Sequence, residues 1–256
     1  MLICAIESAT DRVGCALGDG GVVRACFEVT GARRHAETLV PAIDAACDAA
    51  GVTLDDVGCI AVDVGPGLFT GLRVGLATAK SLAHALDLPM VAVSSLEILA
   101  QPMRIAGRLI AAVIDARRGE VYWHLYRPEP DDIGLVPLGE ARCGPIDDLL
   151  DDLRVSNEPV VLVGDGALRH RDALADLADA SWADEMFAQP SAATLVGLAH
   201  QRRLRGEVTD AISLAPIYLR APDAQINWAV RDGAAGASGA AGTAGATADG
   251  VGRRAG

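Results

Sequence analysis

The chain has 256 residues, with 22 basic and 34 acidic side chains and a formal net charge of −12. That length suits one large domain or two of ordinary size, and the 51% of apolar residues suffices for a buried core. The acidic balance excludes a simple polybasic nucleic-acid binder, because phosphate contacts depend on local positive charge. Apolar runs stay shorter than the roughly 18–20 residues of a membrane span, and the first, 2–6, is too short for a signal-peptide core. The sequence therefore predicts a cytosolic protein without a membrane segment.

The first hundred residues alternate between short strand-like runs and helical patterns. Continuous apolar runs predict strands, whereas Leu39, Ile43 and Cys47 recur at helical spacing. A hairpin turn is expected at 19–21. Thr70 is the expected N-cap of the helix that follows it, over 71–86. In chain order the expected elements are strands over 2–7, 13–18 and 22–29, a helix over 35–50, a strand over 59–64, a helix over 71–86, a strand over 90–93 and a helix over 95–101.

The same order of elements returns in the second half. The elements expected there are strands over 108–114, 120–126 and 133–138, a helix over 145–153, a strand over 160–163 and helices over 167–177 and 191–205. Three antiparallel strands that feed alternating helices and strands, twice over, predict two related α/β lobes, at 1–104 and 105–222. The Gly/Ala-rich stretch 229–256 has no periodicity and is expected to be disordered, because it cannot bury enough apolar surface.

The Gly/Pro-rich loop before the helix over 71–86 is the richest segment for chemistry. It opens a helix whose first backbone amides are unpaired, which is an anion-binding arrangement, and Gly65, Gly67 and Thr70 are its candidate nucleotide contacts. A tight strand-to-helix turn explains the same glycines equally well. Small residues then recur every four positions along the helix, at Gly71, Gly75, Ala79 and Ala83. Such a stripe indicates either close packing inside the chain or an interface with another helix.

Acids and glycines at strand ends supply further candidates. In each lobe the first hairpin carries an acid, and two such hairpins facing each other would resemble a clasp around ATP. An ordinary turn is the alternative interpretation. The candidate nucleotide contacts from these segments are Glu7, Ser8, Asp11, Asp115, Gly164 and Gly166.

Cysteines and histidines give no metal-site pattern. The six cysteines form no CxxC pair and lie mostly in apolar runs, which indicates buried free thiols. The five histidines include no pair spaced three or four residues apart, so the sequence predicts no metal site on a helix.

Taken together, several segments resemble the TsaB family, the bacterial subunits of the machinery that makes threonylcarbamoyladenosine next to the anticodon of tRNA. The resemblance covers about residues 1–222, and its most specific part is the run GPGLFTGLRVG. It implies the two-lobed fold of actin, sugar kinases and Hsp70 ATPases, which is ribonuclease H-like. The matching segments are Ala5–Ser8, His35–Pro41, Gly65–Gly75, Val93–Glu97, Ile114–Tyr122 and Pro216–Arg220.

The resemblance also implies a non-catalytic role. The catalytic relative, TsaD, has a metal-binding His-x-x-x-His motif, and the matching run here begins at Ser95 and ends at Leu99, whose side chains are poor ligands. A TsaB-like chain would form a heterodimer with TsaD through its helices over 40–50 and 71–86 and activate it. The residues expected at this interface are Leu39, Ala42, Ile43, Ala46, Gly71, Leu72, Gly75, Ala79 and Ala83.

Further partners follow from the same resemblance. A TsaE-like ATPase would join the pair, the chain alone would form a homodimer, and tRNA would be reached only through the complex. No cofactor would be bound tightly by the chain itself, while ATP or ADP with magnesium would belong to the interface of the complex. The alternative is an ATP-dependent phosphotransferase or carbamoyl transferase that uses Glu7, Asp11 and Asp115 around magnesium.

Overall fold

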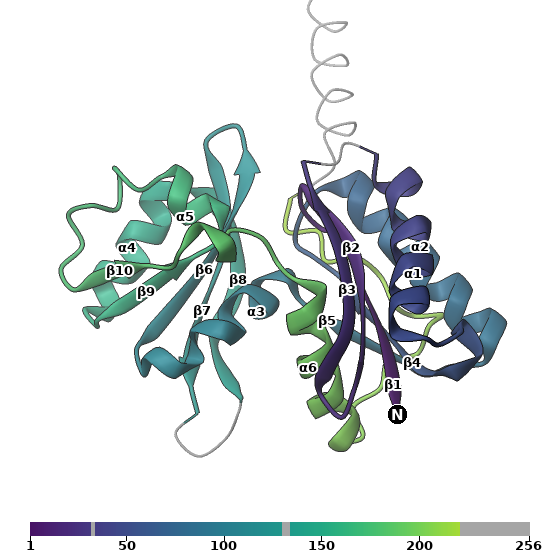
Figure 1. Ribbon diagram of the computed structural model, residues 1–256. Coiled ribbons are helices and arrows are strands. Elements are labelled where there is room, and N and C mark those ends of the chain that lie inside the picture. Colours follow the sequence, from purple (N-terminus) through teal and green to yellow (C-terminus); the bar gives the residue numbers. More distant parts are fainter. Residues whose placement is uncertain (32–33, 130–133, 221–256) are drawn as a thin grey trace, which may run out of the picture. The chain divides into compact units, whose positions relative to one another are not determined.

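The computed structural model describes residues 1–31, 34–129 and 134–220, so the stretch 229–256 lies outside the described residues. It contains two five-stranded sheets, each flanked by helices (Figure 1). The first runs in the order β3-β2-β1-β4-β5 and the second in the order β8-β7-β6-β9-β10. The strands are β1 Leu2–Glu7, β2 Arg12–Asp19, β3 Val22–Thr30, β4 Val57–Asp63, β5 Met90–Val93, β6 Leu109–Arg117, β7 Glu120–Pro128, β8 Leu135–Pro145, β9 Val160–Val163 and β10 Ala180–Trp182.

The two sheets share one topology. In each, three antiparallel strands are followed by two that pair in parallel: β1 with β4 and β4 with β5 in the first sheet, and β6 with β9 and β9 with β10 in the second. This confirms the predicted repetition of the element order. The helices between the strands are α1 His35–Ala50, α2 Phe69–Leu86, α3 Ser95–Ala100, α4 Ile146–Ser156, α5 Asp165–Arg169 and α6 Ala192–Leu204, with short 3-10 turns at Leu54–Asp56, Gln101–Ala106 and Glu185–Phe187.

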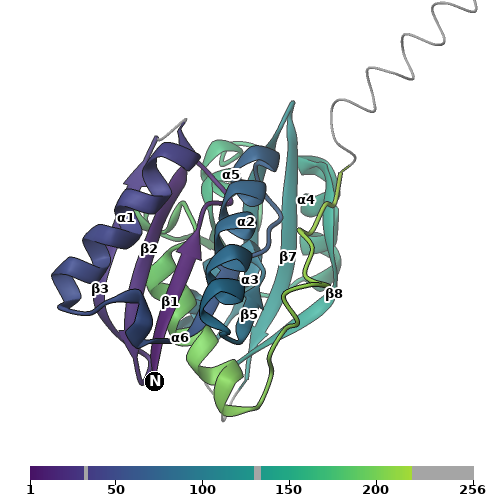
Figure 2. The same ribbon diagram turned by 90° about the vertical axis from the view of Figure 1, so that its right-hand side faces the viewer.

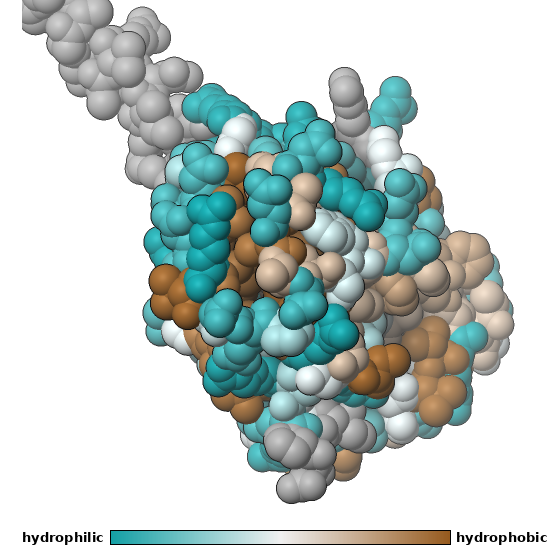
Figure 3. All heavy atoms as spheres, turned by 90° about the vertical axis from the view of Figure 1, so that its left-hand side faces the viewer, coloured by the Kyte–Doolittle hydropathy of each residue, from teal (hydrophilic) through white to brown (hydrophobic). Residues whose placement is uncertain are grey.

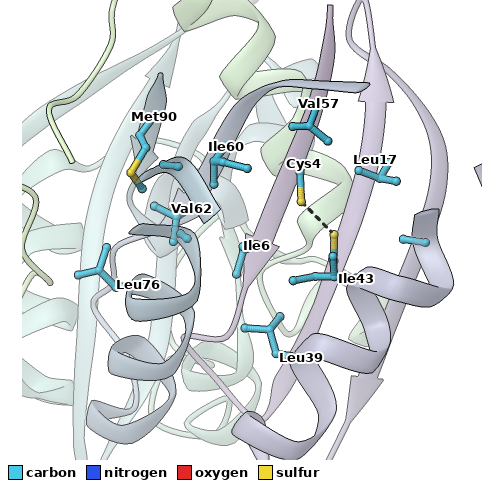
Figure 4. Packing of buried hydrophobic residues seen from close by; sticks show 14 of the residues in the cluster. Cys4, Ile6, Leu17, Leu39, Ile43, Val57, Ile60, Val62, Leu76 and Met90 are labelled. Atoms are coloured by element: carbon cyan, nitrogen blue, oxygen red, sulfur yellow. Dashed lines mark hydrogen bonds between the residues drawn. The ribbon is translucent and has the colours of Figure 1, made fainter. Parts of the chain in front are cut away.

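Helices α1 and α2 lie side by side on one face of the first sheet (Figure 2). Their apolar sides enter a core that contains Leu39 and Ile43 from α1, Leu76 from α2, and Ile6 and Val62 from the sheet (Figure 4). Removing this apolar surface from water is the main stabilisation that holds the helices in place.

The opposite face of the first sheet is covered by α6. Ala192, Leu195 and Val196 pack there against Ile3 and Ala5 of β1. Glu28 of β3 also accepts a hydrogen bond of 2.6 Å from the backbone amide of Ala192, at the start of the helix. The predicted segment 105–222 included a second lobe and a C-terminal helix and strand that return, and α6 packs on the first sheet. Residues Met1–Leu219 form a single compact unit.

Three predictions needed correction. The expected helix over 167–177 ends at Arg169, and the chain continues as turns. Leu174 is the one buried residue in the second half of that range, so a longer helix would have little apolar surface to bury. The strand β10 was missed, since three residues are too few for a periodic pattern. Thr70 is not the N-cap of α2: the helix begins at Phe69 after Leu68, without a side-chain cap.

The cysteines largely follow the prediction. Cys4, Cys15, Cys47 and Cys59 are buried free thiols, with 3.5 Å between the sulfur atoms of Cys4 and Cys15. Cys26 is exposed, because it lies on the edge strand β3. Within the described part of the chain, every helix is too short or too polar to cross a membrane.

Candidate functional site

Two carboxyl groups face each other at the ends of adjacent strands in the first sheet. Glu7 ends β1 and Asp63 ends β4, and both side chains are fully buried. One oxygen of Glu7 accepts a hydrogen bond of 2.8 Å from the amide of Ala9. One oxygen of Asp63 accepts bonds from the amide of Gly65 at 2.7 Å and from the hydroxyl of Ser95 at 2.6 Å. The second oxygen of each has no donor among the described residues.

The burial of this pair favours protonation of the carboxyl groups. Burial raises the pKa of Glu7 well above its ordinary value of 4.5, and the neighbouring carboxylate of Asp63 raises it further. Burial also raises the pKa of Asp63, while its hydrogen bonds from Glu7, Ser95 and Gly65 counteract the shift. Two unprotonated carboxylates in this position would be buried charges without a counterion, which is very costly. The pKa of Glu7 is raised by burial and by the neighbouring Asp63, so Glu7 is the member of the pair that is favoured to keep a proton.

The loops above the acid pair are held together by the chain itself. Leu68 donates its amide to the carbonyl of Ala9 at 2.6 Å, and a Cβ atom at Gly67 would lie 2.1 Å from that same carbonyl oxygen. Gly65 has a φ of +97°, in the left-handed region that favours glycine. The Gly/Pro-rich loop thus needs its glycines for a close backbone approach, which is the turn interpretation offered above.

The equivalent strand ends in the second sheet carry Asp115 and Asp165. Asp115 forms ion pairs with Arg117 at 3.4 Å and Arg169 at 3.5 Å. Asp165 accepts the amide of Asp115 at 2.9 Å and the side-chain amide of Gln189 at 3.2 Å. Burial raises the pKa of Asp165, against the lowering effect of these hydrogen bonds.

The first hairpins of the two lobes meet directly. Arg117 pairs with Asp11 at 3.2 Å while its other terminal nitrogen contacts Asp115, so one guanidinium joins both hairpins. The sequence singled out Asp11 and Asp115 but did not predict that an arginine occupies the space between them.

Most of the candidate nucleotide contacts are engaged inside the chain. Glu7 and Ser8 are buried, and the hydroxyl of Ser8 donates to the carbonyl of Gly71 at 2.9 Å. Gly164 and Gly166 are buried against the backbone of β6, where a Cβ atom would lie 2.1 Å from the Val113 oxygen and 3.0 Å from the Asp115 nitrogen, respectively. The candidates that keep exposed or half-buried positions are Asp11, Gly67 and Thr70.

The residues expected at a partner interface are buried in this chain. A Cβ atom at Gly71 would lie 2.1 Å from the Ser8 carbonyl oxygen, and one at Gly75 would lie 2.1 Å from the Ser8 hydroxyl. The small-residue stripe therefore lets α2 lie close to Ser8, directly after β1, which is the packing alternative inside the chain, while the interface interpretation stays a prediction. The buried set comprises Leu39, Ala42, Ile43, Ala46, Gly71, Leu72, Gly75, Ala79 and Ala83.

Sequence reasoning missed Asp63, Ser95 and Arg117 as members of these clusters. A usable signal existed for Asp63, the one charged residue in the apolar run 59–64. In the parts of the chain that the structure describes, no group of three or more His, Cys, Asp or Glu side chains is arranged to hold a metal ion.

The comparisons with known proteins agree with this architecture. A family model described as "TsaD: tRNA N6-adenosine threonylcarbamoyltransferase" matches residues 21–141. The "tRNA threonylcarbamoyladenosine biosynthesis protein TsaB" of Bacillus subtilis is 32% identical over 231 residues, which is 89% of this chain and 98% of that relative. The protein of the same name from Escherichia coli is 32% identical over 222 residues, 86% of this chain and 95% of the relative.

A solved structure shows the same fold. YeaZ from Pseudomonas aeruginosa matches with a TM-score of 0.71 at 29% identity, covering 85% of this chain and 99% of that chain. This likeness and the repeated sheet topology confirm the two-lobed actin-like, ribonuclease H-like fold. Since relatives of more than 30% identity are matched over nearly their full length, the chain belongs to the TsaB family.

Proposed function

We propose that this chain is a non-catalytic subunit of the machinery that makes threonylcarbamoyladenosine in tRNA, and that it docks on and activates a TsaD-like transferase. Its membership of the TsaB family supports the role in this modification, because relatives matched over nearly their full length carry that name. Activation would be a shift in population, which requires tighter binding to the active state of the transferase than to its inactive states.

The state of the acids supports a role without catalysis. Glu7 is fully buried beside Asp63, and burial raises its pKa, which disfavours an exposed, ionised carboxylate at this position. Asp115 already has two guanidinium partners. Three carboxylates around magnesium, as the enzyme alternative requires, would need these contacts to be broken.

The exposed side of α1 and α2, here called the α1–α2 face, carries the docking proposal. Its charges are divided by helix, since α1 has Glu37, Asp44 and Asp48 and no Lys or Arg, whereas α2 has Arg73 and Lys80 and no acid. Between these charges lie exposed small or apolar side chains. They allow close approach of another helix, and the charges would fix its direction. The uncharged exposed set is Ala36, Val40, Pro41, Ala49, Phe69, Thr70, Ala77, Ser81 and Ala85.

The other partners belong to the same proposal. A TsaE-like ATPase would join the heterodimer, and the α1–α2 face would pair with a second copy when the transferase is absent. The net charge of −12 favours tRNA contact through partners. ATP or ADP with magnesium would bind at the interface of the complex, where Asp11, Gly67 and Thr70 keep accessible positions.

Binding to a purified TsaD-like transferase, measured by calorimetry and size exclusion, tests this proposal. Ala77 is exposed in the middle of α2, so Ala77→Arg should prevent co-elution. The matched control is Val155→Arg, because Val155 is 87% exposed on α4, on another surface. Co-elution that survives Ala77→Arg would contradict the docking face. Micromolar binding of Mg-ATP by the chain alone would favour the enzyme alternative instead.

The surface of the second lobe offers less for a helix to dock on. Figure 3 shows hydrophobic side chains there in separate groups among hydrophilic ones. The exposed apolar residues of that lobe include Val136, Val155 and Met186, which lie on different elements of the chain. The control at Val155 therefore tests a surface from which we expect no contribution to docking.

A further inference from the structure

An exposed arginine at the start of α2 lies on a pair of aromatic rings. The guanidinium carbon of Arg73 is 3.8 Å from the ring centroid of Phe69, whose ring is 5.3 Å from that of Tyr218. The Nε atom of Arg73 donates a hydrogen bond of 3.2 Å to the Tyr218 hydroxyl. All three side chains are exposed, and we call them the Arg73 platform.

The platform joins two segments that are 145 residues apart in sequence, and the later one is anchored. The amide of Ile217 donates to the carbonyl of Val64 at 2.7 Å, next to Tyr218. Further back, the amide of Thr209 donates to the carbonyl of Met90 at 2.8 Å, and Leu214 is buried in the core of the first lobe. Tyr218 is thus presented from a segment fixed to the edge of the sheet.

These contacts leave the far end of the guanidinium available. Stacking and the Nε bond fix its plane, and neither uses the two terminal nitrogens. In the described part of the chain Arg73 makes no ion pair, whereas Arg142 and Arg202 pair with Asp152 and Glu97. A planar guanidinium whose free edge points to solvent is suited to a carboxylate, which accepts two parallel hydrogen bonds from it.

We propose that the Arg73 platform is the anchor that receives a carboxylate side chain of the docked transferase subunit. The inference rests on the function proposed above and names one contact within that interface. A protein carboxylate is favoured over an RNA phosphate, because the neighbouring helix α1 presents Glu37, Asp44 and Asp48, which repel a polyanion. An isolated acid on a partner helix avoids most of that repulsion.

The prior ordering of Arg73 explains why one contact would matter. A free arginine loses rotamer freedom when it pairs, and this loss opposes binding. Here the two rings and the hydroxyl have already restricted the side chain. Arginine and tyrosine are also the residue types that most often dominate the binding free energy of an interface.

Affinity of the full chain for the TsaD-like transferase, measured by calorimetry, tests the anchor. Arg73→Ala should weaken binding by about 10–100-fold, as expected when one partner of a desolvated charge pair is removed. Arg73→Lys keeps the positive charge but loses the planar guanidinium that donates two parallel hydrogen bonds, and should weaken binding by roughly 5–10-fold. Tyr218→Phe keeps the ring but releases the Nε atom, and should have an effect of about 2–5-fold.

The control is Arg154→Ala, since Arg154 is an exposed arginine on α4 and should leave the affinity unchanged. Circular dichroism and the melting temperature verify that each variant folds. Arg73→Ala with an affinity within about twofold of the unmutated chain overturns the anchor while the proposed function stands. No binding by the unmutated chain overturns both. Reduced retention of labelled tRNA by Arg73→Ala, with unchanged affinity for the transferase, identifies a nucleic acid as the occupant and also overturns the anchor.

Discussion

The two lobes repeat one sheet topology, yet equivalent strand ends neutralise their acids differently. At the ends of β1 and β4, Glu7 and Asp63 are buried together, and burial raises the pKa of both. Near the end of β6 and directly after β9, Asp115 is paired with Arg117 and Arg169, and Asp165 accepts a hydrogen bond from Gln189. A strand-end acid in this topology is thus stabilised either by a neighbouring acid that keeps its proton or by guanidinium and amide groups. The buried acid pair makes the stability of the first lobe sensitive to pH. The guanidinium partners of the second lobe place charge near the surface.

Removing the acid pair should have the largest effect on stability. Asp63→Ala leaves Glu7, Ser95 and the Gly65 amide without their acceptor, and should cost about 3–5 kcal/mol of unfolding free energy. The second-lobe counterpart, Asp165→Ala, removes bonds to a partly exposed group and should cost about 1–2 kcal/mol. Urea denaturation measures both values. Equal losses would show that the two strand ends are not energetically different.

The packing of helices on the two sheets offers a second comparison. Gly71→Ala forces α2 away from the backbone of β1 and should destabilise the fold by about 2–3 kcal/mol. Gly166→Ala places its Cβ atom 2.8 Å from the backbone of β6, a less severe overlap, and should cost about 1–2 kcal/mol. The control is Gly197→Ala on α6, where nothing lies within 4 Å, and helix propensity predicts a gain of about 0.5–1 kcal/mol. Thermal unfolding of the three variants gives the order.

The raised pKa of Glu7 predicts a pH dependence of stability that belongs mainly to the first lobe. Because the pKa of Glu7 is raised in the folded chain, that chain keeps a proton that the unfolded chain releases above about pH 4.5. Stability should therefore fall as pH rises from 4.5 to the raised pKa of Glu7. Glu7→Gln keeps the hydrogen bond to Asp63 and should flatten this fall. The pKa of Asp165 is also raised, so the Glu7→Gln variant should still lose some stability as the pH rises, with a smaller slope. Melting temperatures between pH 5 and 9 that fall equally in both proteins would refute the assignment.

The bridge between the hairpins should contribute least. Asp11 and Arg117 are both about half exposed, so Asp11→Ala should change the unfolding free energy by no more than about 0.5 kcal/mol. The difference should disappear in 1 M salt, where exposed pairs are screened. A loss that persists in high salt would mean that Asp11 acts through packing.

The sequence by itself determined the succession of elements and several of their limits. The runs over 2–7, 35–50 and 90–93 correspond to β1, α1 and β5 at their observed bounds, because apolar period and flanking Gly or Pro are local signals. The motif residues also identified the family. These properties depend on neighbours a few positions apart.

Only the tertiary structure decided which side of each element faces the core and which acids meet. Glu7 and Asp63 are 56 positions apart, and the pairing of β1 with β4 places them side by side, where burial raises the pKa of both. The small residues of α2 suited an interface and internal packing equally well, and only the fold shows the close approach of Gly71 to Ser8 inside the chain. Tyr218 joined Phe69 and Arg73 for the same reason: burial and long-range contact are properties of the folded chain, which no local pattern encodes.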